Sequence, residues 1–173
     1  IDHYGGAKEA VKYLIEKGHK RIAHLRGPRE HRHAEERYRA YVDTLLDFGI
    51  PIKKEYVVEG NFHRMSGREA MEELLRVSPL PTAIFAANDK MAIGALQVAK
   101  ERGIKVHDDI TIIGFDGIEA VKYTDPPLPT VEQPLGELGK IAAEILVERI
   151  RGGEEKKIVL PCRLVEWEAK VAS

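Results

Sequence analysis

Several features that mark large classes of protein are missing from this sequence. One cysteine among 173 residues cannot form an internal disulfide bond. No run of about 18 apolar residues is present, so the sequence predicts no membrane-spanning helix. The net charge is -1, which leaves no strongly basic field to attract nucleic acid. The sequence therefore argues against a disulfide scaffold, a membrane-spanning protein and a stretch that binds DNA by itself.

Motifs of common enzymes are missing as well. The sequence has no G-x-S-x-G, no G-x-x-x-x-G-K-[ST], no G-x-G-x-x-G and no H-E-x-x-H. Cys162 follows a proline in a strand-like run, which favours a buried structural thiol over an activated nucleophile. No acid or cysteine completes a metal site around His31 and His33, so a solvated loop is favoured there. We therefore expect neither an enzyme nor a metal or cofactor site.

The sequence does contain a regular alternation of helical and strand-like patterns. The expected helices are 5–17, 34–48, 66–75, 89–102 and 134–151, and the expected strands are 21–25, 56–59, 83–87, 110–115 and 158–165. This alternation predicts an α/β fold with an open, mostly parallel sheet and helices on both faces. We expect a Ser66–Glu69 capping box, Asp89 as a helix N-cap, and a long loop over 117–133.

Two polar residues stand where expected strands end. Asn88 follows the apolar run T-A-I-F-A-A, and Asp116 ends the run I-I-G-F-D. Ligands of open parallel sheets bind beyond the carboxyl ends of the strands. The two side chains are therefore expected side by side at a small-molecule cleft. The alternative for each is a structural role in a turn.

Six segments form a series of motifs along the chain. They are G-H-K-R-I-A-H-L-R-G-P (18–28), R-Y-R-A-Y (37–41), F-A-A-N-D-K-M-A-I-G-A-L (85–96), D-D-I-T-I-I-G-F-D (108–116), P-P-L-P-T-V-E-Q-P (126–134) and V-L-P-C-R-L-V-E (159–166). In this order they resemble the effector-binding core of the lactose/galactose-repressor (LacI/GalR) family of bacterial transcription regulators. The resemblance covers essentially the whole chain.

The resemblance implies a periplasmic-binding-protein-like (type I) core with two lobes. Residues 1–132 would form the C-terminal lobe, 133–151 a helix that belongs mainly to the other lobe, and 152–173 a returning strand and tail. The opening residues look like the middle of a fold. We expect a longer protein whose DNA-binding head, hinge helix and most of the first lobe precede this stretch.

The resemblance also implies roles for individual residues. Arg37 aligns with an effector-contacting arginine, which can bind two hydroxyls or a carboxylate, whereas Arg39 is expected on the surface. Phe62 aligns with an aromatic ring that covers one ligand face, with a core phenylalanine as the alternative. Gln133 would contact the ligand or serve as a hinge residue. With Asn88 and Asp116, these residues form the expected ligand site.

The sequence departs from the family pattern at four positions. The family usually has a second acid where Gly117 follows Asp116, and a proline where His107 stands. Pro129 replaces a threonine, and Trp167 replaces a common arginine. We expect the first two positions to lie near the cleft or its supporting loop.

The leading functional hypothesis is the effector-sensing part of a cytoplasmic transcription regulator, which the resemblance implies to be a repressor. The effector would be a sugar, with purines and nucleosides as the next candidates. The resemblance implies that operator DNA is bound only through the N-terminal head. It also implies a homodimer that forms partly through helix 89–102. No membrane partner is expected. The alternative is a periplasmic sugar-binding protein of a transport system. A hydrolase on this fold is disfavoured by the absent motifs.

Overall fold

The structure is a computed structural model that describes residues 1–167. The end of the expected tail, 168–173, lies outside the described residues. The helices are α1 (His3–Glu16), α2 (Arg32–Asp47), α3 (Arg64–Leu74), α4 (Asp89–Glu101) and α5 (Leu135–Ile150), with short 3-10 turns η1 (Lys54–Tyr56) and η2 (Glu119–Tyr123). The strands are β1 (Ile22–Arg26), β2 (Val57–Glu59), β3 (Ala83–Ala86), β4 (Thr111–Asp116), β5 (Thr130–Glu132) and β6 (Arg163–Val165).

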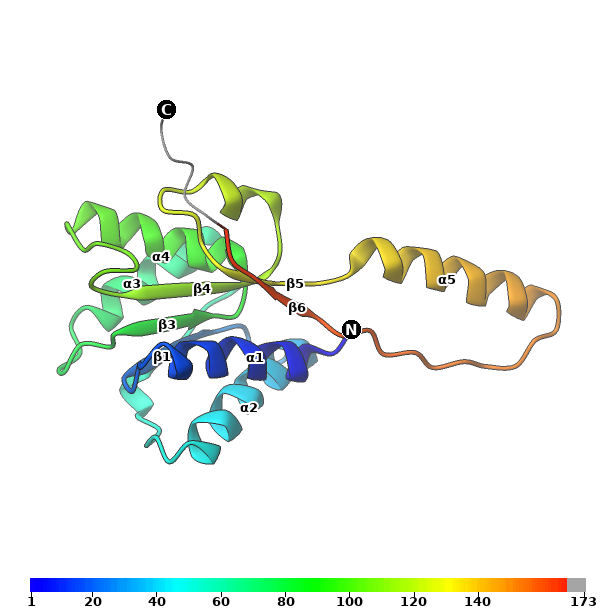
Figure 1. Cartoon of the computed structure of the whole chain (residues 1–173), viewed down its shortest axis with the longest axis horizontal. Coiled ribbons are helices and arrows are strands. Elements are labelled where there is room, and N and C mark those ends of the chain that lie inside the picture. Colours follow the sequence, from blue (N-terminus) through cyan, green and yellow to red (C-terminus); the bar gives the residue numbers. More distant parts are fainter. Residues whose placement is uncertain (168–173) are drawn as a thin grey trace.

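The strands form one sheet in the order β2-β1-β3-β4-β5-β6. Strands β1 to β5 pair in parallel, and β6 pairs with β5 in the antiparallel direction at the edge. Helices α1 and α2 cover one face and α3 and α4 the other (Figure 1). The predicted α/β class, with a mostly parallel sheet between two helical layers, is confirmed.

The central strands are apolar because both of their faces are covered. Alternate residues of β3 point to opposite layers: Ile84 packs with α3 and α4, whereas Phe85 packs with α1 and α2. In β4, Ile112 and Ile113 divide in the same way. Each strand therefore appears in the sequence as a continuous apolar run.

Two expected helix starts differ from the structure. Helix α3 begins at Arg64, so the predicted capping box at Ser66 is wrong. The Ser66 hydroxyl instead donates to the His63 carbonyl and accepts from the backbone N–H of Asn61. Asn88, not Asp89, is the N-cap of α4, because its side chain accepts the N–H of Met91 at 2.9 Å. Both errors come from assigning a local capping role to side chains that have other partners.

The segment expected to be one long loop, 117–133, contains η2 and the strand β5. Strand β5 is only three residues long and follows three prolines. A segment of this length is too short to show the alternation of apolar and polar residues that predicts a strand. The last strand, β6, is also shorter than the expected 158–165. Its place at the sheet edge agrees with the proline that precedes it, Pro161.

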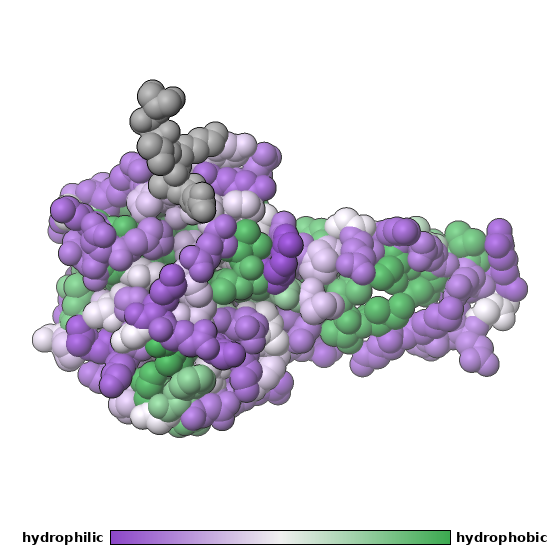
Figure 2. Space-filling view, viewed as in Figure 1, coloured by the Kyte–Doolittle hydropathy of each residue, from purple (hydrophilic) through white to green (hydrophobic). Residues whose placement is uncertain are grey.

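Helix α5 lies beyond the end of the sheet and points away from the body of the molecule, and the following residues run back beside it (Figure 1). No residue of α5 is buried. Leu146 is 61% and Ile150 is 77% exposed, and Figure 2 shows apolar surface along this arm. Among residues 1–167, no helix is both long and apolar enough to cross a membrane. Within residues 1–167, no element buries the apolar face of α5.

Helices α3 and α4 pack closely because two glycines face the opposing backbone. A Cβ added at Gly67 would lie 2.2 Å from the Met91 carbonyl oxygen, and one at Gly94 would lie 2.1 Å from the Arg64 carbonyl oxygen. Backbone atoms cannot move aside as flexible side chains do. The sequence F-A-A-N-D-K-M-A-I-G-A-L thus carries a packing requirement at Gly94.

Gly94→Ala is expected to lower the free energy of unfolding by about 2 kcal/mol, because the added methyl group forces the two helices apart. Denaturant unfolding followed by circular dichroism measures the change. The matched control is Gly139→Ala on α5, where nothing lies within 4 Å of the added Cβ. That control is expected to be neutral or stabilising by up to about 1 kcal/mol. Equal destabilisation by both substitutions would contradict this account.

Candidate ligand-binding site

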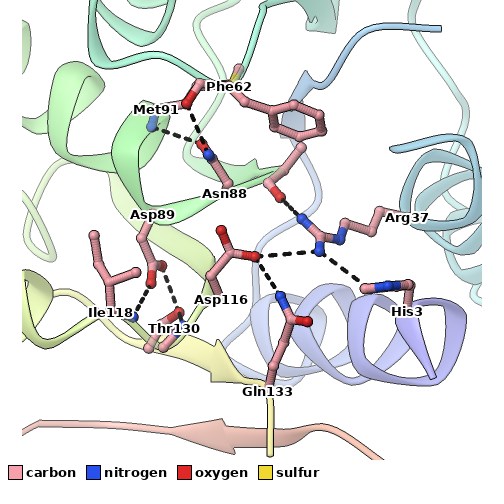
Figure 3. Close-up of polar contacts among 12 residues, drawn as sticks. His3, Arg37, Phe62, Asn88, Asp89, Met91, Asp116, Ile118, Thr130 and Gln133 are labelled. Carbon is pink, nitrogen blue, oxygen red and sulfur yellow. Dashed lines mark hydrogen bonds and ion pairs between the residues drawn. The ribbon is translucent and has the colours of Figure 1, made fainter. Parts of the chain in front are cut away.

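The five predicted site residues surround one pocket of about 370 Å³ at the carboxyl edge of the sheet. Its lining is made of Arg37, Phe62, Asn88, Asp116 and Gln133, together with His3 and His33. They come from separate parts of the chain: α1, α2, the loop before α3, and the ends of β3, β4 and β5. Figure 3 shows the polar contacts that join them.

Arg37 is the most connected residue of the pocket. Its side chain is 3% exposed, and its guanidinium lies 3.7 Å from the ring centroid of Phe115. It donates to the carbonyl oxygen of Ala87, and it contacts His3 Nδ1 at 3.2 Å and Asp116 Oδ1 at 3.3 Å (Figure 3). A buried cation requires such partners, because desolvation without them is costly. Arg39, by contrast, is exposed, as predicted.

Asp116 presents one engaged and one unengaged oxygen. Oδ1 accepts from Arg37 and, at 2.7 Å, from the side-chain amide of Gln133. Within residues 1–167, Oδ2 has no hydrogen-bond partner. Burial raises the pKa of this carboxyl, and the charge of Arg37 opposes the rise. Asp116 can therefore accept hydrogen bonds from a ligand while Arg37 holds it in place.

Asn88 lies at the pocket but both ends of its amide are already engaged. Oδ1 accepts the N–H of Met91, and Nδ2 donates to the Phe62 carbonyl at 2.9 Å (Figure 3). One N–H of the amide remains for another partner. The two interpretations of Asn88, as a structural residue and as a ligand contact, are thus compatible. In its structural role, the Asn88 side chain holds the backbone of Phe62, whose ring lines the pocket.

Phe62 adopts a backbone φ of 67°, which non-glycine residues rarely adopt. Its ring lies over Gly27, where an added Cβ would approach the ring to 2.3 Å. The ring of His33 stacks on it with a centroid distance of 5.3 Å and an interplanar angle of 18°. Phe62 is partly buried rather than a core residue. It forms one apolar wall of the pocket together with His33.

His3 and His33 line the pocket although neither was predicted to do so. Burial, followed by the charge of Arg37, lowers the pKa of His3 to about 4 and also lowers the pKa of His33. Both rings are consequently neutral near neutral pH. A sequence feature could have indicated each of them. His33 precedes Arg37 by one helical turn and so shares its helix face, and His3 opens a helix that follows an expected strand end.

Asp89 and Gly117 do not line the pocket but fix the position of β5 beside it. Asp89 accepts from the Thr130 hydroxyl at 2.6 Å and from the backbone N–H of Ile118 at 2.8 Å, and so joins α4 to β5. Burial raises the pKa of Asp89 to about 7, and these donors oppose the rise. Gly117 has a φ of 74°, and an added Cβ would lie 2.7 Å from the Cα of Glu132. A side chain at position 117 would therefore push β5 away from the pocket.

His107 lies away from the Arg37 pocket but contacts the loop between Asp116 and Gln133. Its Nε2 lies 3.1 Å from the Pro127 carbonyl oxygen, and it lines a different pocket, with Thr111 at the start of β4. Cys162 is half-buried against the α1 and α2 layer rather than fully buried. Among residues 1–167, no group of three or more histidine, cysteine or acidic side chains is arranged to hold a metal ion.

The seven lining residues include no serine, threonine, cysteine or lysine that could act as a nucleophile. They provide a carboxylate, an amide, a guanidinium and flat aromatic rings, which are groups that orient a small molecule. Fold and site together define an α/β protein with a pocket whose lining suits a small molecule.

Comparison with known proteins agrees with this class. Residues 11–168 match the family of periplasmic binding protein-like domains. The HTH-type transcriptional repressor CytR of Escherichia coli (strain K12) is 42% identical over 152 residues, which are 88% of this chain and 45% of CytR. A LacI-family regulatory protein from Chloroflexus aggregans has a TM-score of 0.92 and 39% identity, over 96% of this chain and 61% of that one. A complex of the transcriptional regulator CelR with cellobiose has a TM-score of 0.91 and 36% identity, over 98% and 52% of the two chains.

The chain belongs to the periplasmic binding protein-like domain family and is homologous to LacI-family repressors. The resemblance predicted from the sequence is confirmed. The chain spans about half the length of the curated relatives that it matches, 45% of CytR for example.

Arg37→Met is expected to lower the free energy of unfolding by about 2–4 kcal/mol near neutral pH. It leaves a half-buried Asp116 without its cation and the Ala87 carbonyl without this donor. Denaturant titration measures the loss. The matched control is Arg39→Met, which removes an exposed arginine two positions away and should change stability by less than about 0.5 kcal/mol.

The loss of unfolding free energy in the Arg37→Met variant, relative to the wild-type chain, should shrink as the pH falls from about 7 to about 4. Without Arg37, the pKa of Asp116 in the folded protein rises further above its value in the unfolded chain. A raised folded-state pKa means that the native state holds the proton more tightly, so acid favours folding. A deficit that stays constant over this range would show that Asp116 does not depend on Arg37.

Proposed function

We propose that this chain is the ligand-sensing part of a LacI-type transcriptional regulator and that its pocket binds a sugar. The observation that carries the proposal is the convergence of Arg37, Asp116 and Gln133 in one hydrogen-bond network beside the ring of Phe62. The homology to LacI-family repressors supports regulation over transport. The homologues are transcriptional regulators rather than enzymes, which supports binding over catalysis.

The chemistry of the pocket favours a neutral polyhydroxylated ligand. The charges of Arg37 and Asp116 balance, and the two lining histidines are neutral near neutral pH. Asp116 Oδ2 is an acceptor for hydroxyl groups, and the Phe62 ring suits the C–H face of a pyranose. The solved complex of the related CelR contains cellobiose, which supports the same class of ligand here.

A purine or nucleoside is the second candidate. The nearly parallel rings of His33 and Phe62 extend the aromatic wall, and a flat wall suits a planar heterocycle. The amides of Asn88 and Gln133 can donate to and accept from the edge of a base. A direct comparison of sugars with nucleosides decides between the two classes.

We also propose the division of the chain that the family architecture implies. Residues 1–132 would form one lobe, α5 within 133–151 would pack in the other lobe, and 152–173 would return and continue as a tail. The exposed apolar face of α5 supports this division. A ligand between the lobes would act through its different affinities for the open and closed states. The whole protein would then act in the cytoplasm as a homodimer that binds operator DNA through a separate head.

Phe62→Ala in the whole protein is expected to weaken binding of the cognate ligand by about tenfold, because it removes the aromatic wall. Isothermal titration calorimetry measures the affinity. The control is Phe48→Ala, which removes a 48% exposed ring at the end of α2, away from the pocket, and should leave the affinity unchanged. Equal effects of the two variants would place the ligand elsewhere.

The same titrations test regulation when operator binding is measured in parallel. The cognate ligand should change operator affinity in the whole protein, and Phe62→Ala should shift that change to higher ligand concentration. Ligand binding that leaves operator affinity unchanged would refute the regulatory proposal while leaving the binding site intact.

The 173-residue chain alone is expected to self-associate through the uncovered face of α5. Sedimentation at tens of micromolar, roughly the range of weak association, should detect oligomers. Leu146→Glu combined with Ile150→Glu should return the chain to a monomer, since both side chains are exposed on α5. Glu144→Gln, an exposed change on the same helix, is the control. A wild-type chain that is strictly monomeric would contradict the expectation.

A further inference from the structure

A second pocket, of about 410 Å³, lies at the opposite end of the sheet, where the strands begin. Its walls come from the end of α1, the start of β4, the proline-rich loop before β5 and the residues after β6. The volume is in the range of pockets that hold small molecules. None of its residues lines the pocket around Arg37.

The floor of this second pocket is held by side-chain contacts between three strands. The imidazole of His19, just before β1, lies 3.1 Å from both the Thr82 and the Thr111 hydroxyl oxygens. Thr82 precedes β3 and Thr111 begins β4. Burial lowers the pKa of His19, so the ring is neutral. The pocket is therefore already formed, and its floor adds no charge.

The walls combine flat apolar surfaces with polar groups. Tyr13, Trp167 and three prolines contribute the apolar surfaces, and one face of each ring is covered by a lysine Nζ, that of Lys17 at 5.1 Å from the Tyr13 centroid and that of Lys122 at 4.5 Å from the Trp167 centroid. Lys17 and Glu166 contribute a half-exposed ion pair with an N–O distance of 3.8 Å. The charges of this pair cancel, so the pocket does not select an ion. A ring with apolar faces and a hydroxylated rim matches both kinds of surface.

The backbone is strained at this pocket, as it is at the first. His107, which lines it, has a φ of 79°, and backbone strain of this kind gathers at ligand sites.

We propose that this second pocket binds a neutral sugar ring, stacked on Trp167 and Tyr13 and hydrogen-bonded at its rim to Lys17 and Glu166. The proposal does not depend on the function proposed for the pocket around Arg37. The ten described residues that line the second pocket all belong to this chain, so the chain alone should bind this ligand.

Occupancy of the second pocket would be transmitted to the first through short strands. Pro129 precedes β5, and Gln133, which donates to Asp116, follows it. Strand β5 is three residues long, so Pro129 and Gln133 on either side of it are only about 13 Å apart. Glu166 and Trp167 directly follow β6, which pairs with β5. A sugar at the second pocket would therefore restrain both strands that reach the first.

Trp167 provides a direct test, because it is the single tryptophan of the chain. Neutral monosaccharides and disaccharides are titrated into the 173-residue chain while tryptophan emission is recorded. At least one sugar is expected to give a saturable change with a Kd on the order of 1 mM. Lys17→Ala combined with Glu166→Ala should weaken the response at least about tenfold, since two rim partners are removed.

Phe48→Ala is the matched control, because its 48% exposed ring lines neither pocket and its removal should leave the tryptophan response unchanged. The absence of any saturable response up to about 100 mM would overturn the proposal. A response that persists in the Lys17–Glu166 double variant, or is lost in Phe48→Ala, would overturn it as well. Saturation by indole or by a proline-rich peptide, but by no sugar, would reject a sugar as the ligand.

Discussion

The burial of the Arg37 guanidinium is the constraint on which the ligand pocket depends. A cation enclosed to this degree needs partners for its charge and its N–H groups, and the partners of its two terminal nitrogens come from three places in the fold, whereas Nε has no hydrogen-bond partner within residues 1–167. Helix α1 supplies His3, the end of β3 supplies the Ala87 carbonyl, and the end of β4 supplies Asp116. The ring of Phe115 covers the guanidinium face. The pocket exists because one arginine on α2 draws the ends of neighbouring elements to a common point.

The same constraint explains why the backbone is strained around the pocket. Asp116 has a φ of 118° and Phe62 a φ of 67°, both in the region that side chains disfavour. Asp116 must turn one oxygen toward Arg37 and Gln133 while β4 ends, and Gly117 then lets the chain turn tightly against β5. Asn88 holds the strained Phe62 by its carbonyl. An additional acid at position 117, common in the family pattern, would need β5 to move.

The sequence was sufficient to predict the class of fold and the place of the site. Continuous apolar runs revealed buried parallel strands, and Asn88 and Asp116 at their ends pointed to the binding edge. Local rules failed where a side chain had a distant partner: Asp89 bonds Thr130, 41 positions away, rather than capping its own helix. Strand β5 was missed because three residues carry no measurable period. His33 was missed because its stacking on Phe62 depends on a contact between α2 and a distant loop.

Strand β5 is the element through which the two pockets can influence each other. It is tied to α4 by the Thr130–Asp89 hydrogen bond and to the Arg37 network by Gln133. Its outer partner is β6, which is short, lies at the sheet edge and leads back from α5. In the proposed two-lobed protein, movement of the other lobe would reach this lobe through these two strands. Closure that displaces β5 would pull Gln133 from Asp116 and loosen the hold of Arg37 on that carboxylate. Ligand binding at the carboxyl edge and movement of the strands are therefore linked by the same few hydrogen bonds.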